Sequence, residues 1–166
     1  MFKEYSQLAV DISNGNLPAV TYVKGGYSSS GTNQDSTEHP GNSISGGEKL
    51  NTAVINQILA SSKYKDNTVV FLVPDESGGF RDSQFPPPRS NVDNKLYGPR
   101  TQFLAVGNMV KKNYVSHVVT EPASIIRFLE SNYLADGKPG QLKTRDQVAG
   151  SLNDLFEPTL VGFTFP

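Results

Sequence analysis

Two adjacent carboxylates, Asp75 and Glu76, are the residues of this sequence best suited to chemistry. They follow the apolar run from Thr68 to Pro74, and Gly78 and Gly79 come shortly after them. Carboxylate oxygens are the ligands that hard divalent cations such as Ca²⁺, Mg²⁺ and Mn²⁺ prefer. Neighbouring strand residues point to opposite faces, so both carboxylates can reach one ion only where the strand has ended. Pro74 and the glycines predict such an end, and the pattern therefore indicates a divalent metal site.

The same two carboxylates have two other interpretations. An acidic pair can simply mark a solvent-exposed strand end. Asp75 or Glu76 can also act in a glycoside hydrolase, together with a distant carboxylate such as Asp35. That chemistry needs two carboxyl groups facing each other across a sugar, roughly 5–9 Å apart, a geometry that neighbours in sequence rarely reach.

His39 is the histidine best placed for chemistry. It lies in the sequence Glu38-His39-Pro40, within a long polar segment from Gly25 to Ser43 that reads as a loop. Loops of this length in a compact domain are usually functional or disordered. A loop histidine above a strand end can donate a proton or a hydrogen bond to a phosphoryl oxygen. The alternative is an exposed histidine without a role, and for His117 a structural or surface position is favoured.

The elements that position these residues begin with a predicted amphipathic helix, which ends at Asn14-Gly15. Its apolar residues recur at helical spacing: Phe2, Tyr5, Leu8, Ala9 and Ile12. Residues 17–24 are rich in β-branched side chains and predict a strand. Ser45 and Glu48 fit a capping box that opens a second helix. Its apolar face runs from Leu50 to Leu59.

The rest of the chain predicts two further strands and two further helices. Thr68–Pro74 is almost continuously apolar, which is typical of a buried strand in a parallel sheet. Residues 101–107 form the next strand, and residues 121–134 a helix with Ile125, Ile126, Leu129 and Tyr133 on its inner face. A linker at 136–144 precedes a short helix at 146–156. The alternation predicts an α/β layered fold, although only about three strands are evident.

Composition excludes several classes of protein. The 166 residues suit one domain, and the net charge of -1 gives no general attraction to nucleic acids or anionic membranes. The absence of cysteine excludes disulfides and thiolate metal sites. No apolar run approaches the roughly 18 residues of a membrane span. Acidic and polar residues interrupt the N-terminal apolar positions, so this segment is not predicted to be a signal peptide.

The order of motifs along the chain resembles the C-terminal section of a phosphoesterase family. This family contains bacterial acid phosphatases and non-haemolytic phospholipases C. The resemblance covers nearly the whole chain and rests on the succession LPAVTYVK, EHPGNSISGGEKLNTAVINQIL, TVVFLVPDESGGFRDSQFPPP, YGPRTQFLAVGNMVKKNYVSHVV, EPASIIRFLESNYL and TRD.

The resemblance implies a fold and a reaction. The fold would be the alkaline-phosphatase-like α/β type, a three-layer sandwich with a mostly parallel central sheet, of which residues 1–166 form a single partial domain. The reaction would be metal-dependent hydrolysis of a phosphate ester. The substrate would be either a soluble ester or a phospholipid whose head group is released. The acidic pair would ligate the divalent metal ion, which maps onto Asp75 and Glu76. The histidine of the His-Pro motif would hold or protonate the phosphoryl group, which maps onto His39.

Parts of the family pattern are absent from this sequence. There is no stretch like ENxSFD, which supplies further metal ligands in the family, and no evident nucleophile, since Ser77 and Ser83 are near the acidic pair only in sequence. Arg81-Asp82-Ser83 stands where many members have tyrosine, aspartate and histidine. We therefore expect an N-terminal section or a second chain to complete the site. Members of the family are usually exported, so the resemblance also implies a location in the periplasm or outside the cell. The alternative is a non-catalytic binding remnant of the same fold.

Overall fold

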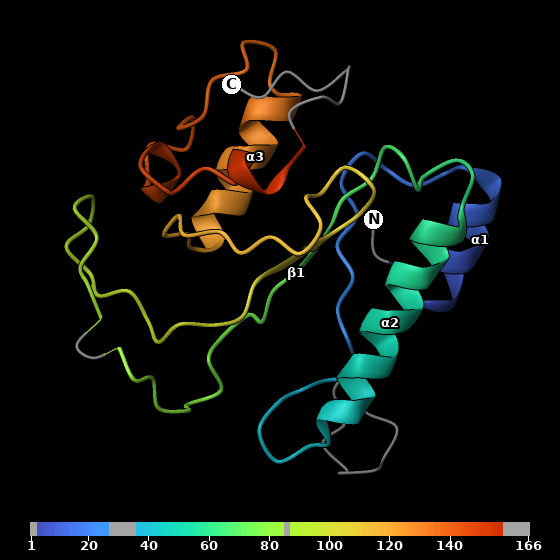
Figure 1. Cartoon of the computed structure of the whole chain (residues 1–166), viewed down its shortest axis with the longest axis horizontal. Helices are drawn as coiled ribbons and strands as arrows, with labels where there is room; N and C mark the ends of the chain where they lie inside the picture. The colour runs from blue at the N-terminus through green and yellow to red at the C-terminus, as the bar shows by residue number, and fades with distance from the viewer. Residues whose placement is uncertain (1–2, 27–35, 85–86, 158–166) are drawn as a thin grey trace. The chain divides into compact units, whose positions relative to one another are not determined.

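The computed structural model describes residues 3–26, 36–84 and 87–157, which form helices and one small sheet (Figure 1). The chain divides into two compact units, one of residues 1–78 and 102–108, and one of residues 79–101 and 109–166. The elements in order are α1 (Ser6–Asn14), α2 (Ile44–Ala60), β1 (Val70–Leu72), β2 (Leu104–Val106), α3 (Pro122–Tyr133), and the 3₁₀ turns η1 (Arg145–Gln147) and η2 (Asn153–Leu155). No helix in these residues is long and apolar enough to cross a membrane.

Helix α1 confirms the first predicted helix and its end. Gly15 adopts a left-handed conformation with φ of 73°, which glycine reaches without the steric cost of a Cβ atom. The Gly15 N–H donates to the Ile12 carbonyl and the Asn16 N–H to the Asp11 carbonyl, the two bonds of a Schellman motif. Ile12 is buried, and α1 packs beside α2 (Figure 1).

Helix α2 is also confirmed, but its predicted start is wrong. The helix begins at Ile44 with Ser43 as its N-cap, two residues before the proposed capping serine, Ser45. The Ser45 hydroxyl lies 2.7 Å from the Ser43 hydroxyl instead of capping the helix. Of the predicted apolar face, Ile58 is buried.

Strands β1 and β2 pair with each other in an antiparallel register, with Phe71 opposite Ala105. The phenylalanine rings of Phe71 and Phe103 lie 5.5 Å apart. The apolar run before Asp75 led us to predict a strand of a parallel sheet. The pairing of these two strands differs from that prediction. An apolar run indicates that a strand is covered on both faces, but it does not indicate whether the neighbouring strand is parallel or antiparallel. In the structure the residues of β1 are half-buried.

The predicted strand at residues 17–24 is wrong. The segment bends at Ala19 and Val20 and is not a strand, and Tyr22 is 83% exposed. β-Branched residues favour an extended backbone, but a strand also needs a neighbouring strand with which to form a ladder of hydrogen bonds. The sheet of the described residues consists of β1 and β2.

Helix α3 matches the prediction for residues 121–134, and it borders the core of the second unit. Pro122 occupies the first turn, and the Glu121 N–H donates to the Ser124 hydroxyl over 3.1 Å. The predicted inner face is partly wrong, because Phe128 is buried whereas Ile126 and Tyr133 are exposed. The Phe128 ring stacks on Phe156 at 5.4 Å, and this contact fixes which face of α3 turns inward.

The predicted helix at 146–156 is replaced by η1 and η2. Leu152, between the two turns, is only 1% exposed, so the apolar pattern reported burial correctly. A Cβ atom at Gly150 would lie 2.1 Å from the Val119 carbonyl oxygen. This close backbone approach needs glycine, and glycine also lowers helix propensity by about 1 kcal/mol relative to alanine.

Candidate functional site

Asp75 and Glu76 lie just beyond β1, in a segment that has already left the strand. β1 ends at Leu72, and Gly78 and Gly79 both have positive φ, 69° and 77°. The predicted break of the strand before the acidic pair is therefore confirmed. Both carboxylates are exposed, so they are accessible to a ligand from solvent.

Asp75 has a cationic partner, Lys24. The Lys24 ammonium lies 3.7 Å from Asp75 Oδ2, and the two side chains are 70% and 73% exposed. An exposed pair of this kind contributes little to stability, roughly 0–1 kcal/mol. The ion pair matters here for position, because it holds the segment before Gly25 next to Asp75 and Glu76.

His39 is exposed and lies at a turn of the chain, within the sequence Glu38-His39-Pro40. Its Nδ1 lies 2.9 Å from the Pro40 carbonyl oxygen, so this nitrogen donates a hydrogen bond in the tautomer with Nδ1–H. The His39 N–H donates to the Thr37 hydroxyl, and the His39 carbonyl accepts from Asn42 N–H. These bonds fix both the backbone and the ring of an exposed histidine.

The segment Lys24–Gly26 joins the two predicted motifs within one compact unit. While Lys24 pairs with Asp75, the Gly26 N–H donates to the Ser36 hydroxyl over 2.8 Å, and the Ser36 N–H donates to the Gly26 carbonyl over 3.2 Å. Ser36 precedes His39 by three residues. The chain thus links the acidic pair to the histidine motif through three consecutive residues. Whether Asp75, Glu76 and His39 act in catalysis stays a prediction.

Glu38 and Gly47 support the histidine motif through a contact that the sequence analysis did not predict. Asn51 of α2 donates to Glu38 Oε1 over 3.2 Å. A Cβ atom at Gly47 would lie 2.3 Å from Glu38 Cγ, so only glycine lets this side chain lie against the helix. A glycine pair inside a helical pattern was the available signal, since glycine there often marks a close packing contact.

The acidic pair suits a divalent cation but is not a complete metal site. Two carboxylates are fewer than the six to eight oxygen ligands of Ca²⁺, or the octahedral set of Mg²⁺. Within the described residues there is no group of three or more histidine, aspartate or glutamate side chains placed to hold a metal ion. Asp35, the alternative glycosidase partner, lies outside the described residues. Asp75 and Glu76 therefore fit a metal ion as part of a larger ligand set.

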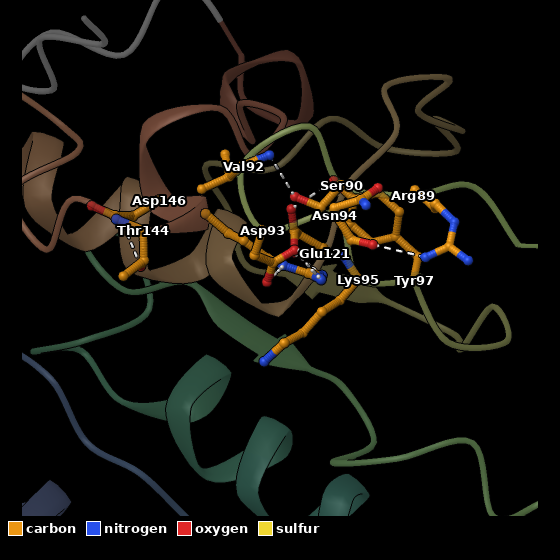
Figure 2. Close-up of polar contacts among 11 residues, drawn as sticks. Arg89, Ser90, Val92, Asp93, Asn94, Lys95, Tyr97, Glu121, Thr144 and Asp146 are labelled. Atoms are coloured by element: carbon orange, nitrogen blue, oxygen red, sulfur yellow. Dashed lines mark hydrogen bonds and ion pairs between the residues drawn. The ribbon is translucent and has the colours of Figure 1, made fainter.

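The second unit contains a polar cluster of its own, and Figure 2 shows Asp93, Tyr97 and Glu121 gathered in it. Arg145 of the Thr-Arg-Asp motif contacts all three. The Arg145 guanidinium donates to both Asp93 oxygens, over 3.0 and 3.1 Å, and to Glu121 Oε2 over 3.2 Å. It also lies 4.8 Å from the Tyr97 ring centroid, and the Tyr97 hydroxyl donates to Glu121 Oε1. One arginine thereby ties the turn around Asp93 to the start of α3.

This cluster perturbs the protonation of its members. Hydrogen bonds from the Arg145 side chain, and then from the Lys95 N–H, lower the pKa of Asp93 to about 2. Burial and the hydrogen bond to Glu121 raise the pKa of Tyr97. Because each carboxylate and hydroxyl is engaged inside the cluster, we assign it to structure and not to catalysis.

Asp82 and Ser83, which follow the acidic pair, are engaged by Arg100. The guanidinium donates to Asp82 Oδ1 over 2.8 Å and to the Ser83 hydroxyl over 3.0 Å. Hydrogen bonds from the Arg100 side chain and backbone hold the pKa of Asp82 well below its usual range. Ser83 therefore lies beside a cation, whereas Ser77 has no hydrogen bond from its side chain among the described residues.

Comparisons with known proteins agree with the motif order. The sequence matches the Phosphoesterase family over residues 2–134. It is similar to non-specific phospholipase C5 of Arabidopsis thaliana, with 29% identity over 140 residues, which are 80% of this chain and 26% of the plant protein. The chain thus spans about a quarter of the length of that relative. No solved structure matches the chain significantly.

Proposed function

Because this chain belongs to the Phosphoesterase family, we propose that it supplies part of the active site of a metal-dependent enzyme that hydrolyses phosphate esters. The reaction would be of the acid phosphatase or phospholipase C type. The observation that carries the proposal is the segment Lys24–Gly26, which contacts Asp75 at one end and Ser36, near His39, at the other. Family membership leaves no support for the glycoside hydrolase alternative.

The proposed roles follow from the chemistry of each side chain. Asp75 and Glu76 would hold the divalent ion together with ligands from elsewhere. When bound, such an ion neutralises charge on phosphoryl oxygens and lowers the pKa of an attacking hydroxyl. His39 would donate a proton or a hydrogen bond to the phosphoryl group, with its ring oriented by the bond to the Pro40 carbonyl. Lys24 would hold Asp75 in place through their ion pair.

The proposal extends to the rest of the fold. The helices and the small sheet would belong to a three-layer, alkaline-phosphatase-like sandwich with a mostly parallel sheet. An N-terminal section or a second chain would contribute the remaining strands, further metal ligands and the nucleophile. The substrate would be a soluble phosphate ester or a phospholipid head group, and the protein would act in the periplasm or outside the cell.

Hydrolysis of a chromogenic phosphate monoester and diester tests this function, when it is measured with a panel of divalent ions on the chain together with the section or second chain that completes it. We expect metal-dependent turnover that falls at least about 100-fold in Asp75→Ala and Glu76→Ala, because a lost ligand weakens both metal binding and charge neutralisation. Asp136→Ala is the matched control and should retain wild-type turnover, since within the described ranges its carboxylate accepts a hydrogen bond only from Lys138 N–H. No turnover with any ion would refute the catalytic proposal for this chain.

That outcome would favour the alternative, a non-catalytic binding remnant of the same fold. Two observations point toward it. Arg100 donates hydrogen bonds to the side chains of both Asp82 and Ser83, in the stretch where many family members carry a histidine. The described residues also lack a cluster able to hold a metal alone. A remnant would bind phosphate esters at most, without turnover.

A further inference from the structure

A cavity of about 260 Å³ lies in the second unit, lined by α3, by Pro139 and by the segment Ser151–Asn153 at the start of η2. Phe128 and Leu152 provide apolar surface, and both are buried. Its polar lining includes Arg127 and Ser131, which lie one turn apart on the same side of α3, and Ser151 from the segment before η2. None of the residues lining the cavity is a carboxylate.

Arg127 brings a positive charge to this cavity, and no carboxylate in the part of the chain that the structure describes neutralises it. Its Nη1 donates to the Gln147 carbonyl over 2.7 Å, which fixes the guanidinium in place. No aspartate or glutamate of the described residues forms an ion pair with it. A guanidinium carries five N–H donors, so most of them stay available to a ligand. By contrast, Arg100 and Arg145 in the same unit are both paired with carboxylates.

The two serines add hydroxyl donors. The Ser151 hydroxyl accepts a bond from the Asn153 N–H over 3.1 Å, which leaves its hydrogen without an acceptor among the described residues. Ser131 makes no hydrogen bond through its side chain within the same residues. The cavity therefore combines an apolar surface, the hydroxyl donors of Ser131 and Ser151 and the cation Arg127. This combination is complementary to an anion with several acceptor oxygens.

Two acidic residues adjoin the cavity in sequence, Glu130 beside Ser131 and Asp154 beside Asn153, and neither is paired with Arg127. Glu130 accepts hydrogen bonds from the N–H groups of Gly140 and Gln141, over 2.7 and 3.1 Å. Asp154 accepts from the hydroxyls of Tyr114 and Ser116, over 3.1 and 2.6 Å. Both oxygens of Glu130 and Oδ2 of Asp154 are thus engaged by other segments, and neither carboxylate forms an ion pair with Arg127.

We propose that this cavity binds the phosphate group of a small organophosphate. Arg127, Ser131 and Ser151 would donate to the phosphate oxygens, and Phe128 with Leu152 would contact the organic part. Donors from two separate segments suit a tetrahedral group better than a planar carboxylate, whose two oxygens lie in one plane. This site involves none of the residues assigned to hydrolysis, so it can exist whether or not the chain is an enzyme.

Isothermal titration calorimetry with phenylphosphonate tests the site, because the carbon–phosphorus bond of this probe resists phosphoesterase hydrolysis. We expect saturable binding that weakens at least about tenfold in Arg127→Gln, since a lost charge-assisted hydrogen bond is worth roughly 1.5–3 kcal/mol. Ser131→Ala and Ser151→Ala should each weaken binding by a smaller factor. Benzenesulfonamide, which keeps the ring but carries no charge, should not bind.

Two variants separate this site from other effects. Arg89→Gln removes the same charge from the same unit and also breaks a bond to a backbone carbonyl, that of Asn94, outside the cavity. It should bind like the wild type. Asp75→Ala should also retain phenylphosphonate binding even where it abolishes turnover, so failure of this site and failure of the proposed hydrolysis are distinguishable.

The source of the phosphate group is settled by two further probes. Inorganic phosphate binding as tightly as phenylphosphonate would assign the site to free phosphate. Binding to phosphatidic acid vesicles, lost in Arg127→Gln, would assign it to a lipid head group. Equal binding of phenylphosphonate by the wild type and Arg127→Gln, equal loss in Arg89→Gln, or no saturable binding of any of these three probes would overturn the proposal.

Discussion

Gly25 shows at the residue scale how the candidate site depends on a position without a side chain. A Cβ atom there would lie 1.8 Å from the Ser36 carbonyl oxygen. Because a backbone atom cannot turn aside as a side chain can, Gly25→Ala should lower the free energy of unfolding by about 2 kcal/mol. It should also lower phosphoester turnover, since it pushes the Ser36 segment away from the Lys24 segment. Urea denaturation followed by circular dichroism, with the hydrolysis assay, measures both effects.

The adjacent Gly26 provides the control. The nearest atom to a Cβ at Gly26 is the Ser36 hydroxyl, at 3.7 Å, which is an ordinary contact. Gly26→Ala should therefore change stability by less than about 0.5 kcal/mol, as is usual for surface substitutions. If both variants lose the same stability, the close approach at Gly25 is not the cause.

The sequence analysis predicted the local backbone of the candidate site but not its contacts between distant residues. The break after β1 followed from Pro74 and the glycines, because those residue types limit backbone conformation locally. The contacts Lys24–Asp75 and Glu38–Gly47 were not foreseen, since they join residues far apart in the chain. Neither a single lysine nor a glycine pair carries information about which distant residue it will meet.

Arg145 acts at the scale of elements, because it connects the turn at Asp93 with the start of α3. The folded-state pKa of Asp93 is about 2, whereas an aspartate in an unfolded chain titrates near 3.9. The unfolded chain therefore takes up a proton first as the pH falls, and this contribution to stability is lost between about pH 4 and pH 2. Asp93→Asn cannot take up that proton. Its free energy of unfolding should fall less steeply across this range than that of the wild type.

Urea denaturation at a series of pH values tests this expectation. Asp136→Asn is the control, because no arginine or lysine of the described residues forms an ion pair with Asp136. Its pH dependence should follow the wild type. Parallel curves for Asp93→Asn and the wild type below pH 4 would show that Arg145 does not control this carboxylate.

Helices were predicted better than strands for a physical reason. The bounds of α1 and α3 follow from Gly15 and Pro122, whose effects on the backbone are local. The antiparallel pairing of β1 with β2 and the missing strand at 17–24 depend on which segments become neighbours. The prediction of a helix at residues 146–156 was wrong because the backbone at Gly150 approaches Val119, which is again a contact between residues distant in sequence.

The division into two compact units is a property of the whole molecule that can be measured. Phe128 stacks on Phe156 in the core of the second unit, so Phe128→Ala should destabilise that unit by about 3 kcal/mol. In hydrogen exchange followed by mass spectrometry, α3 should lose protection, while α2 in the first unit should retain most of its protection. Phe80→Ala is the control, because this side chain is 71% exposed. Equal loss of protection in α2 and α3 would mean that the units unfold as one.

The pair of hydrogen bonds between Gly26 and Ser36 has a consequence for protein engineering. These bonds hold together the two ends of the nine residues between them, at positions 27–35. The free-energy cost of bringing the two ends of a chain segment together rises slowly with its length, by about 0.6 kcal/mol for each doubling. A peptide tag or a reporter sequence grafted between Gly26 and Ser36 should therefore leave His39 and Asp75 where they are. The chain offers an insertion point beside its candidate site.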